Sequence, residues 1–303
     1  MKQQHTDFDI FQQITDKIIA QMEQGIIPWE RPWTGIASGA TSWTSRKPYS
    51  FLNQMLLGTA GEFITWKAIQ ENGGTLKKGA KAQFVVFWKQ VRYEKKDKDG
   101  NPKLGADGKP EMGVLPVLRY YNVYRIEDVE GIAPHEAPLP AVEREPLTAG
   151  EDTINGYLSR EDSPKFTPTE SNRAYYSPSR DEVVVPLPAQ FPDLAAYYAT
   201  AFHELTHSTM TASRCNRIGD GARDSHFGDE NYSREELVAE IGSAMLMNSC
   251  GIENAHTERN TIAYLQSWLE ALKNDKRMIV VAAGRAEAAA RFILTGEKKE
   301  YAR

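Results

Sequence analysis

Cysteine is scarce in this chain of 303 residues, which contains only Cys215 and Cys250. Two cysteines supply neither a disulfide framework nor a Cys-x-x-Cys metal site, and we expect free thiols in a reducing, cytoplasmic setting. The sequence has no apolar run of membrane length, and its first residues are polar, so neither membrane association nor a signal peptide is expected. It also lacks an internal repeat, a phosphate-binding loop and a Ser-His-Asp signature.

The most informative motif is His203-Glu204-Leu205-Thr206-His207, which has the form His-Glu-x-x-His. The segment that follows Asp193 has helical periodicity, and on a helix residues i and i+4 share a face, so His203 and His207 can reach one ion. Glu204 can hold the water that fills an open metal position, which is the arrangement of zinc hydrolases. The alternative is a helix whose histidines only face solvent or a polar core. A β-branched strand at residues 181–186 precedes this helix, and its edge could bind an extended peptide.

A catalytic zinc site usually has three protein ligands, so a third is expected elsewhere. A second strong helix is predicted over residues 233–246, where Glu236 and Glu240 lie four residues apart on one face. We assign Glu236 as the metal ligand and Glu240 as the carboxylate that holds a histidine ring nitrogen. The two roles could be inverted, and Glu236 could instead be only the capping-box partner of Ser233, with Glu240 solvated. Zinc suits two imidazoles and a carboxylate, although manganese or another divalent transition ion could occupy the same site.

The overall net charge of −5 alone argues against nucleic-acid binding, but the charge is unevenly distributed. Residues 1–135 hold 18 Lys and Arg against 15 Asp and Glu, whereas the remainder holds 18 against 26. Five of the six tryptophans also fall within the first 88 residues. Basic surfaces with exposed rings bind single strands through phosphate contacts and base stacking, although most such rings fill cores. The candidate DNA-binding residues from this pattern are Trp29, Trp33, Trp66, Lys77, Lys78, Lys81 and Trp88.

The pattern of elements predicts an α+β fold with two domains. The first domain, residues 1–132, combines short helices with a long hairpin, and residues 63–72 are expected to be helical. A proline-rich linker is expected at residues 133–147. The second domain, residues 148–303, is expected to be mostly helical, with the two motif helices followed by two more.

Two resemblances to known families add to this interpretation. The pattern of His203, His207, Glu236 and Glu240 resembles a gluzincin, and residues 227–240 resemble the metallopeptidase domain of the ArdC antirestriction family and of related plasmid and phage proteins. Pro28-Trp29 and the segments 47–53 and 73–87 resemble the N-terminal single-stranded-DNA-binding domain of that family, which plasmid TraC-type primases share. The resemblance implies a zincin-like metalloprotease domain and adds Lys47, Tyr49 and Asn53 as DNA-binding candidates.

We therefore expect an antirestriction protein that binds single-stranded DNA and cleaves an unidentified peptide or protein substrate. Duplex DNA is a second candidate ligand. Glu204 would be the general base, and His226 or Tyr232 could donate to the oxyanion. The alternative is a DNA-coating protein without enzyme activity, in which the metal site is structural or vestigial. An accessory role beside a primase ranks last because no primase motif is present.

Overall fold

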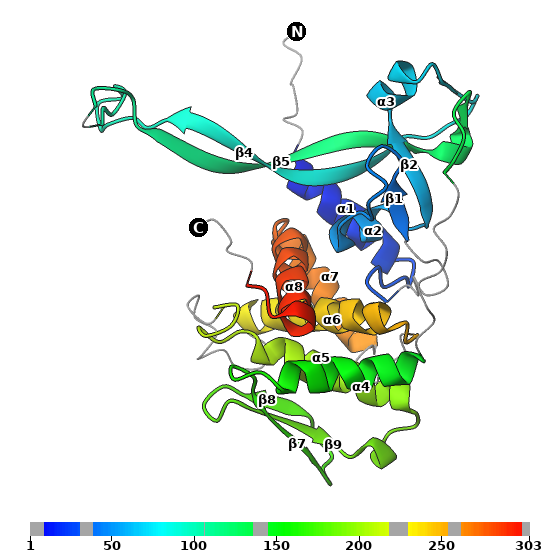
Figure 1. Cartoon of the computed structure of the whole chain (residues 1–303), viewed down its shortest axis with the longest axis vertical. Helices are drawn as coiled ribbons and strands as arrows, with labels where there is room; N and C mark the ends of the chain where they lie inside the picture. The colour runs from blue at the N-terminus through cyan, green and yellow to red at the C-terminus, as the bar shows by residue number, and fades with distance from the viewer. Residues whose placement is uncertain are drawn as a thin grey trace.

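The computed structural model describes residues 9–30, 39–105, 107–135, 145–217, 230–253 and 262–298. The chain forms a mixed α+β structure of two halves, which confirms the predicted fold class. A sheet with a long two-stranded ribbon lies at one end of the molecule, a smaller sheet lies at the other, and helices fill the space between them (Figure 1). No helix in these described ranges has both the length and the apolarity needed to cross a bilayer.

The N-terminal half contains a sheet with the strand order β1-β2-β5-β4. Strand β1 runs parallel to β2, and the other neighbours are antiparallel. The elements of this half are α1 (Ile10–Met22), β1 (Ala40–Ser42), α2 (Phe51–Leu57), β2 (Gly61–Thr65), α3 (Trp66–Glu71), β3 (Thr75–Leu76), β4 (Gln83–Glu94), β5 (Met112–Arg125), the 3-10 helix η1 (Ile126–Asp128) and β6 (Val129–Glu130).

Local chemistry explains where several of these elements begin and end. The Asp9 carboxylate accepts hydrogen bonds from the backbone N–H groups of Phe11 and Gln12, and so caps α1. Gly58 ends α2 with a φ of 65°, a conformation that glycine adopts without a steric penalty. The prediction of one helix over residues 63–72 is wrong in its first part, because Phe63–Thr65 belongs to β2. The Thr65 hydroxyl then accepts from Ala68 N at 3.3 Å and starts α3.

The C-terminal half has its own sheet of β7 (Lys165–Thr169), β8 (Tyr175–Ser177) and β9 (Glu182–Pro186). Strand β9 is central, parallel to β7 and antiparallel to β8. The expectation that the strand at residues 181–186 offers an edge to a peptide is therefore wrong, because both of its sides carry a partner strand. The other elements of this half are α4 (Pro146–Leu158), the 3-10 helix η2 (Pro188–Gln190), α5 (Leu194–Ser208), α6 (Glu230–Cys250), α7 (Ile262–Asn274) and α8 (Met278–Thr295).

One hydrophobic core joins the two halves. Helix α1 packs against α7, and α2 packs against α8. Trp29 lies in this shared core, where its ring meets Trp268 of α7 edge-to-face at a centroid distance of 5.4 Å. Polar contacts reinforce the junction, including the hydrogen bond from the Thr15 hydroxyl to Lys276 O at 2.9 Å. The domain boundaries at 132 and 148 stay predictions, since residues 136–144 lie outside the described ranges.

Helices α5 and α6 pack closely in the C-terminal half. Gly242 of α6 faces Thr206 of α5, and a β-carbon at this glycine would lie 2.6 Å from Thr206 Cγ2. This close approach brings the backbones of the two helices together and lets their polar side chains meet. A second core, which includes Tyr157, Phe202 and Phe292, packs around α5 and also takes in Leu246 and Met247 of α6.

Candidate metal centre

Helix α5 presents both motif histidines from one face, as the spacing predicts. Asp193 caps the helix by accepting a hydrogen bond from Ala196 N at 2.8 Å. His203 and His207 are both buried, and their Nε2 atoms lie 3.1 Å apart. Two imidazole nitrogens at this separation converge on one point, as the ligands of a single ion do.

Helix α6 brings Glu236 to the same point. One carboxylate oxygen of Glu236 lies 3.3 Å from His207 Nε2, and the other lies 3.5 Å from His203 Nε2. One donor atom from each of these three residues lies within 4.8 Å of the others. Two imidazoles and a carboxylate are a common donor set for divalent transition metals, so these side chains fit the predicted ion.

The outer nitrogen of each histidine also contacts a carboxylate. His203 Nδ1 lies 3.3 Å from an oxygen of Glu240, and His207 Nδ1 lies 3.4 Å from Glu235 Oε1. Carboxylates in this position fix the ring orientation and leave Nε2 directed at the metal. The structure thus brings Glu240 against His203, and the role assigned to Glu240 stays a prediction. It also adds Glu235, which sequence reasoning missed.

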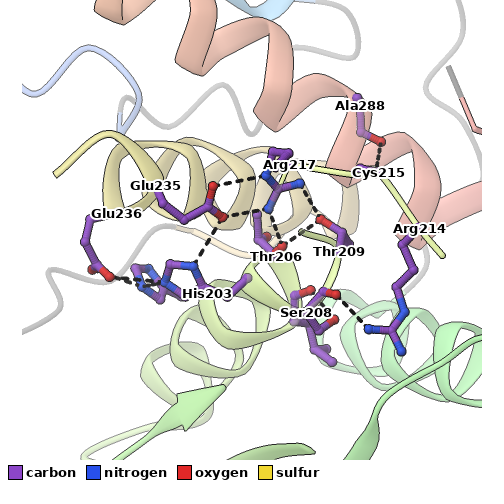
Figure 2. Close-up of polar contacts among 12 residues, drawn as sticks. His203, Thr206, Ser208, Thr209, Arg214, Cys215, Arg217, Glu235, Glu236 and Ala288 are labelled. Carbon is purple, nitrogen blue, oxygen red and sulfur yellow. Dashed lines mark hydrogen bonds and ion pairs between the residues drawn. The ribbon is translucent and has the colours of Figure 1, made fainter. Parts of the chain in front are cut away.

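Arg217 holds Glu235 in place (Figure 2). Its Nη2 lies 2.7 Å from Glu235 Oε1, and its Nε lies 3.1 Å from Oε2, so the guanidinium binds the carboxylate through two nitrogens. The same guanidinium donates to Thr206 O and to the Thr209 hydroxyl, both at the C-terminal end of α5. Arg217 therefore connects the segment after α5 to α6 and, through Glu235, to His207.

The carboxylates make the centre strongly attractive to positive charge. Burial lowers the pKa of His207, but hydrogen bonds to Glu235 and Glu236 outweigh burial and raise that pKa to about 10. Burial raises the pKa of Glu236, but the two histidines outweigh it and lower the pKa well below its ordinary value. The charge of Glu204, which is buried one residue after His203, adds to the same field. A field that favours a proton on an imidazole also favours a bound cation.

One alternative for the site is corrected by the structure, and the two predicted oxyanion donors cannot be placed from the described residues. The capping-box alternative for Ser233 and Glu236 is wrong, because α6 begins at Glu230 and Ser233 lies inside the helix. His226, a candidate oxyanion donor, lies outside the described ranges. Tyr232 lies in α6, but its side chain is not among those described.

Two of the predicted DNA-binding residues have structural roles. Trp29 is 1% exposed, so its ring has no face free for a base, and the prediction that it stacks on DNA is wrong for this conformation. Asn53 is fully buried. Its amide donates to Val86 O at 2.9 Å and accepts from Val86 N at 2.8 Å, which satisfies the backbone at the edge of β4. A DNA contact by Asn53 is therefore wrong for the same reason.

The other DNA-binding candidates are more accessible. Trp66 and Trp88 are 44% and 56% exposed, whereas Tyr49 is largely buried. Lys77 is exposed, and its ammonium group donates to Glu127 O at 2.7 Å. The remaining lysines of the set, Lys47, Lys78 and Lys81, are exposed, and Trp33 lies outside the described ranges.

Comparison with known families agrees with the division into halves. Residues 8–124 match the family described as the N-terminal domain of the anti-restriction factor ArdC. Residues 161–285 match the family described as zincin-like metallopeptidase. The second match includes both motif histidines and Glu236.

Solved structures and curated relatives extend the likeness over nearly the whole chain. The antirestriction protein ArdC of plasmid R388 is 31% identical, and the match covers 94% of this chain and 97% of that one. The TM-score is 0.68 for its metal-free form and 0.67 for its Mn(II)-bound form. A DNA primase TraC of Escherichia coli is 32% identical over 95% of this chain, which spans only 27% of the primase. The uncharacterized protein y4eC of Sinorhizobium fredii is 30% identical, and the match covers 93% of this chain and 90% of y4eC.

Proposed function

Because this chain belongs to the ArdC antirestriction family, we propose that it protects DNA from restriction by combining single-stranded-DNA binding with metal-dependent peptide hydrolysis. The observation that carries the hydrolytic part is the convergence of His203, His207 and Glu236 on one point. A purely structural cluster would have no need of a further buried carboxylate, Glu204, beside the ligand set. The DNA-binding part rests on the family match of residues 8–124 and on the basic character of that half.

In this proposal His203, His207 and Glu236 hold one divalent ion. Zinc suits the donor set, and manganese is supported by the Mn(II)-bound form of the R388 relative. When bound, the ion supplies Lewis acidity, which polarises a scissile carbonyl and lowers the pKa of water. Glu235 and Glu240 keep the two imidazoles in the orientation that directs Nε2 at the ion.

Glu204 acts as the general base in the proposed hydrolysis. It removes a proton from the attacking water as the new C–O bond forms, and it delivers that proton to the amine nitrogen as the C–N bond breaks. Its burial favours this role because a carboxylate shielded from bulk water interacts strongly with groups in the site. The substrate is a peptide or protein of unidentified sequence.

The test compares wild type with Glu204→Ala in three assays: metal content, peptidase activity and protection of plasmid DNA in a restricting host. Glu270→Ala, at an exposed position of α7, is the matched control. We expect Glu204→Ala to keep its metal, because Glu204 contacts water rather than the ion, and to lose hydrolysis and protection. Lost hydrolysis with full protection would instead favour the DNA-coating alternative. A wild type that carries no metal and gains none from added zinc or manganese would contradict the metal centre.

A further inference from the structure

The two faces of the β4–β5 ribbon differ in what covers them. Residues paired directly across antiparallel strands share a face, and alternate residues along one strand point to opposite faces. One face packs towards α1. It carries Val86 and Trp88, which are two residues apart on β4, and Leu118, which pairs with Trp88 across the ladder. We call the opposite one the open face; it carries Val85, Phe87, Lys89, Val91 and Tyr93 of β4 and Gly113, Leu115, Val117, Arg119, Tyr121 and Val123 of β5.

Aromatic rings line the open face where the ribbon leaves the core. Val85 and Val123 are buried there beneath Tyr49. Beyond them, the Phe87 ring lies 6.2 Å from the Tyr49 ring and 5.9 Å from the Tyr121 ring, measured between centroids. Phe87 and Tyr121 are 46% and 45% exposed, so each presents about half of its surface to solvent. Rings on an open sheet surface are the common platform for stacking unpaired bases.

The charges on the open face all have one sign. Arg119 lies directly opposite Phe87 in the ladder, and Lys89 follows two residues along β4. None of the open-face positions of the two strands is acidic. Lys47, which is exposed, lies two residues before Tyr49 and adds positive charge at the same end. Cations beside exposed rings complement a phosphate backbone whose bases are free to stack.

Trp88 illustrates the difference between the faces. It is adjacent to Phe87 and more exposed, but it belongs to the opposite face, where its ring lies 6.3 Å from the Phe11 ring of α1. Exposure alone therefore does not identify the rings of one binding surface, whereas the strand register does.

We propose that the open face of the β4–β5 ribbon is a binding surface for single-stranded DNA, with bases stacked on Phe87 and Tyr121 and phosphates beside Arg119 and Lys89. The inference rests on the DNA-binding part of the proposed function and assigns it to one face of one element. Beyond these residues, the distal part of the ribbon extends past the helical body (Figure 1). An apolar protein partner fits this surface less well, because Arg119 would be buried beside Phe87 without an opposite charge.

The experiment measures binding of the full-length protein to a fluorescein-labelled oligo-dT and to a duplex of equal length across a range of salt concentrations. The double variant Phe87→Ala/Tyr121→Ala should weaken oligo-dT binding by about 5- to 150-fold per ring, the range for base-stacking aromatics. Tyr120→Ala is the matched control and should leave affinity within about twofold, because this 43% exposed ring lies opposite Val86 on the face that packs towards α1. Arg119→Gln should reduce the slope of log affinity against log salt by about 1. Phe87→Leu/Tyr121→Leu keeps the apolar surface and replaces the alanine pair if that pair fails to fold. The leucine pair should also weaken oligo-dT binding, because it removes both rings.

The outcomes separate this inference from the proposed function. Wild type that binds no oligo-dT would contradict the DNA-binding function itself. The open-face assignment would be overturned, with the function left intact, if both double variants bound oligo-dT as tightly as wild type. It would also be overturned if Tyr120→Ala weakened binding more than the double variants did. Equal loss of duplex and oligo-dT binding in the folded leucine pair would also overturn it, because stacking requires unpaired bases.

Discussion

Replacing Trp29 by alanine tests whether this tryptophan belongs to the core or to the DNA surface. The indole is 1% exposed and packs edge-to-face on Trp268, so alanine leaves a large cavity between the N-terminal helices and α7. Truncation of a buried Trp typically lowers the free energy of unfolding by about 3–5 kcal/mol. The lost aromatic pair places the expected value towards the upper end, since such pairs contribute about 0.5–1.5 kcal/mol beyond their buried area. That loss is a third or more of the total stability of an ordinary domain, about 5–15 kcal/mol.

The assay is urea unfolding followed by far-ultraviolet circular dichroism, which does not depend on the removed fluorophore. Trp66→Ala is the control, since this ring is 44% exposed, and a surface substitution changes stability by about 0.5 kcal/mol or less. We expect Trp29→Ala to lower the midpoint of the main transition, because Trp29 lies in the core that both halves share. Unchanged unfolding by Trp29→Ala together with weaker binding to single-stranded DNA would refute this reasoning and restore the stacking role.

Two further predictions concern the charged contacts of the C-terminal half. Glu235→Gln removes the charge next to His207 and should weaken metal affinity by about 10–100-fold, measured by competition with a chromogenic chelator; affinity equal to wild type would contradict a positioning role. Partial burial raises the pKa of Asp181, but hydrogen bonds from Arg214 and Tyr176 outweigh it and lower that pKa. The Asp181 contribution to stability is therefore present above pH 3.8, the ordinary value, and is lost as the pH falls through the lowered one. Thermal melts of wild type and Asp181→Asn should accordingly differ at neutral pH and converge in acid, and a constant difference would contradict the pairing.

Helical periodicity was sufficient to predict which side chains of the candidate metal centre share one face of a helix. His203 and His207 are four residues apart, and so are Glu236 and Glu240, so each pair occupies one face whatever the rest of the chain does. Glu235 escaped prediction because its contact with His207 depends on how α6 packs against α5 and on Arg217, which comes from a segment with no regular period. No short-range pattern in the sequence connects Glu235 to Arg217.

The tryptophan-rich N-terminal segment shows the opposite case. The two prolines around Trp29 predict a loop, and loops usually lie on the surface. The ring is buried because α7, more than 230 residues away in the sequence, supplies Trp268 against it. Asn53 was misassigned for a similar reason, since the unpaired backbone of β4 that its amide satisfies becomes apparent only when the strand order is known. Long-range packing decided both residues.

Helix α6 contributes to both halves at once. Glu236 faces His203 and His207, while the adjacent Leu237 and Val238 enter the core shared with α1 and α2. Exchange of the N-terminal half for an unrelated domain would leave one side of α6 without its partner. The constraint predicts that relatives match this chain across both halves. The TraC primase carries both halves within a much longer chain, and y4eC carries them almost alone. In both relatives the match spans the two halves, so each side of α6 retains the counterpart of its partner.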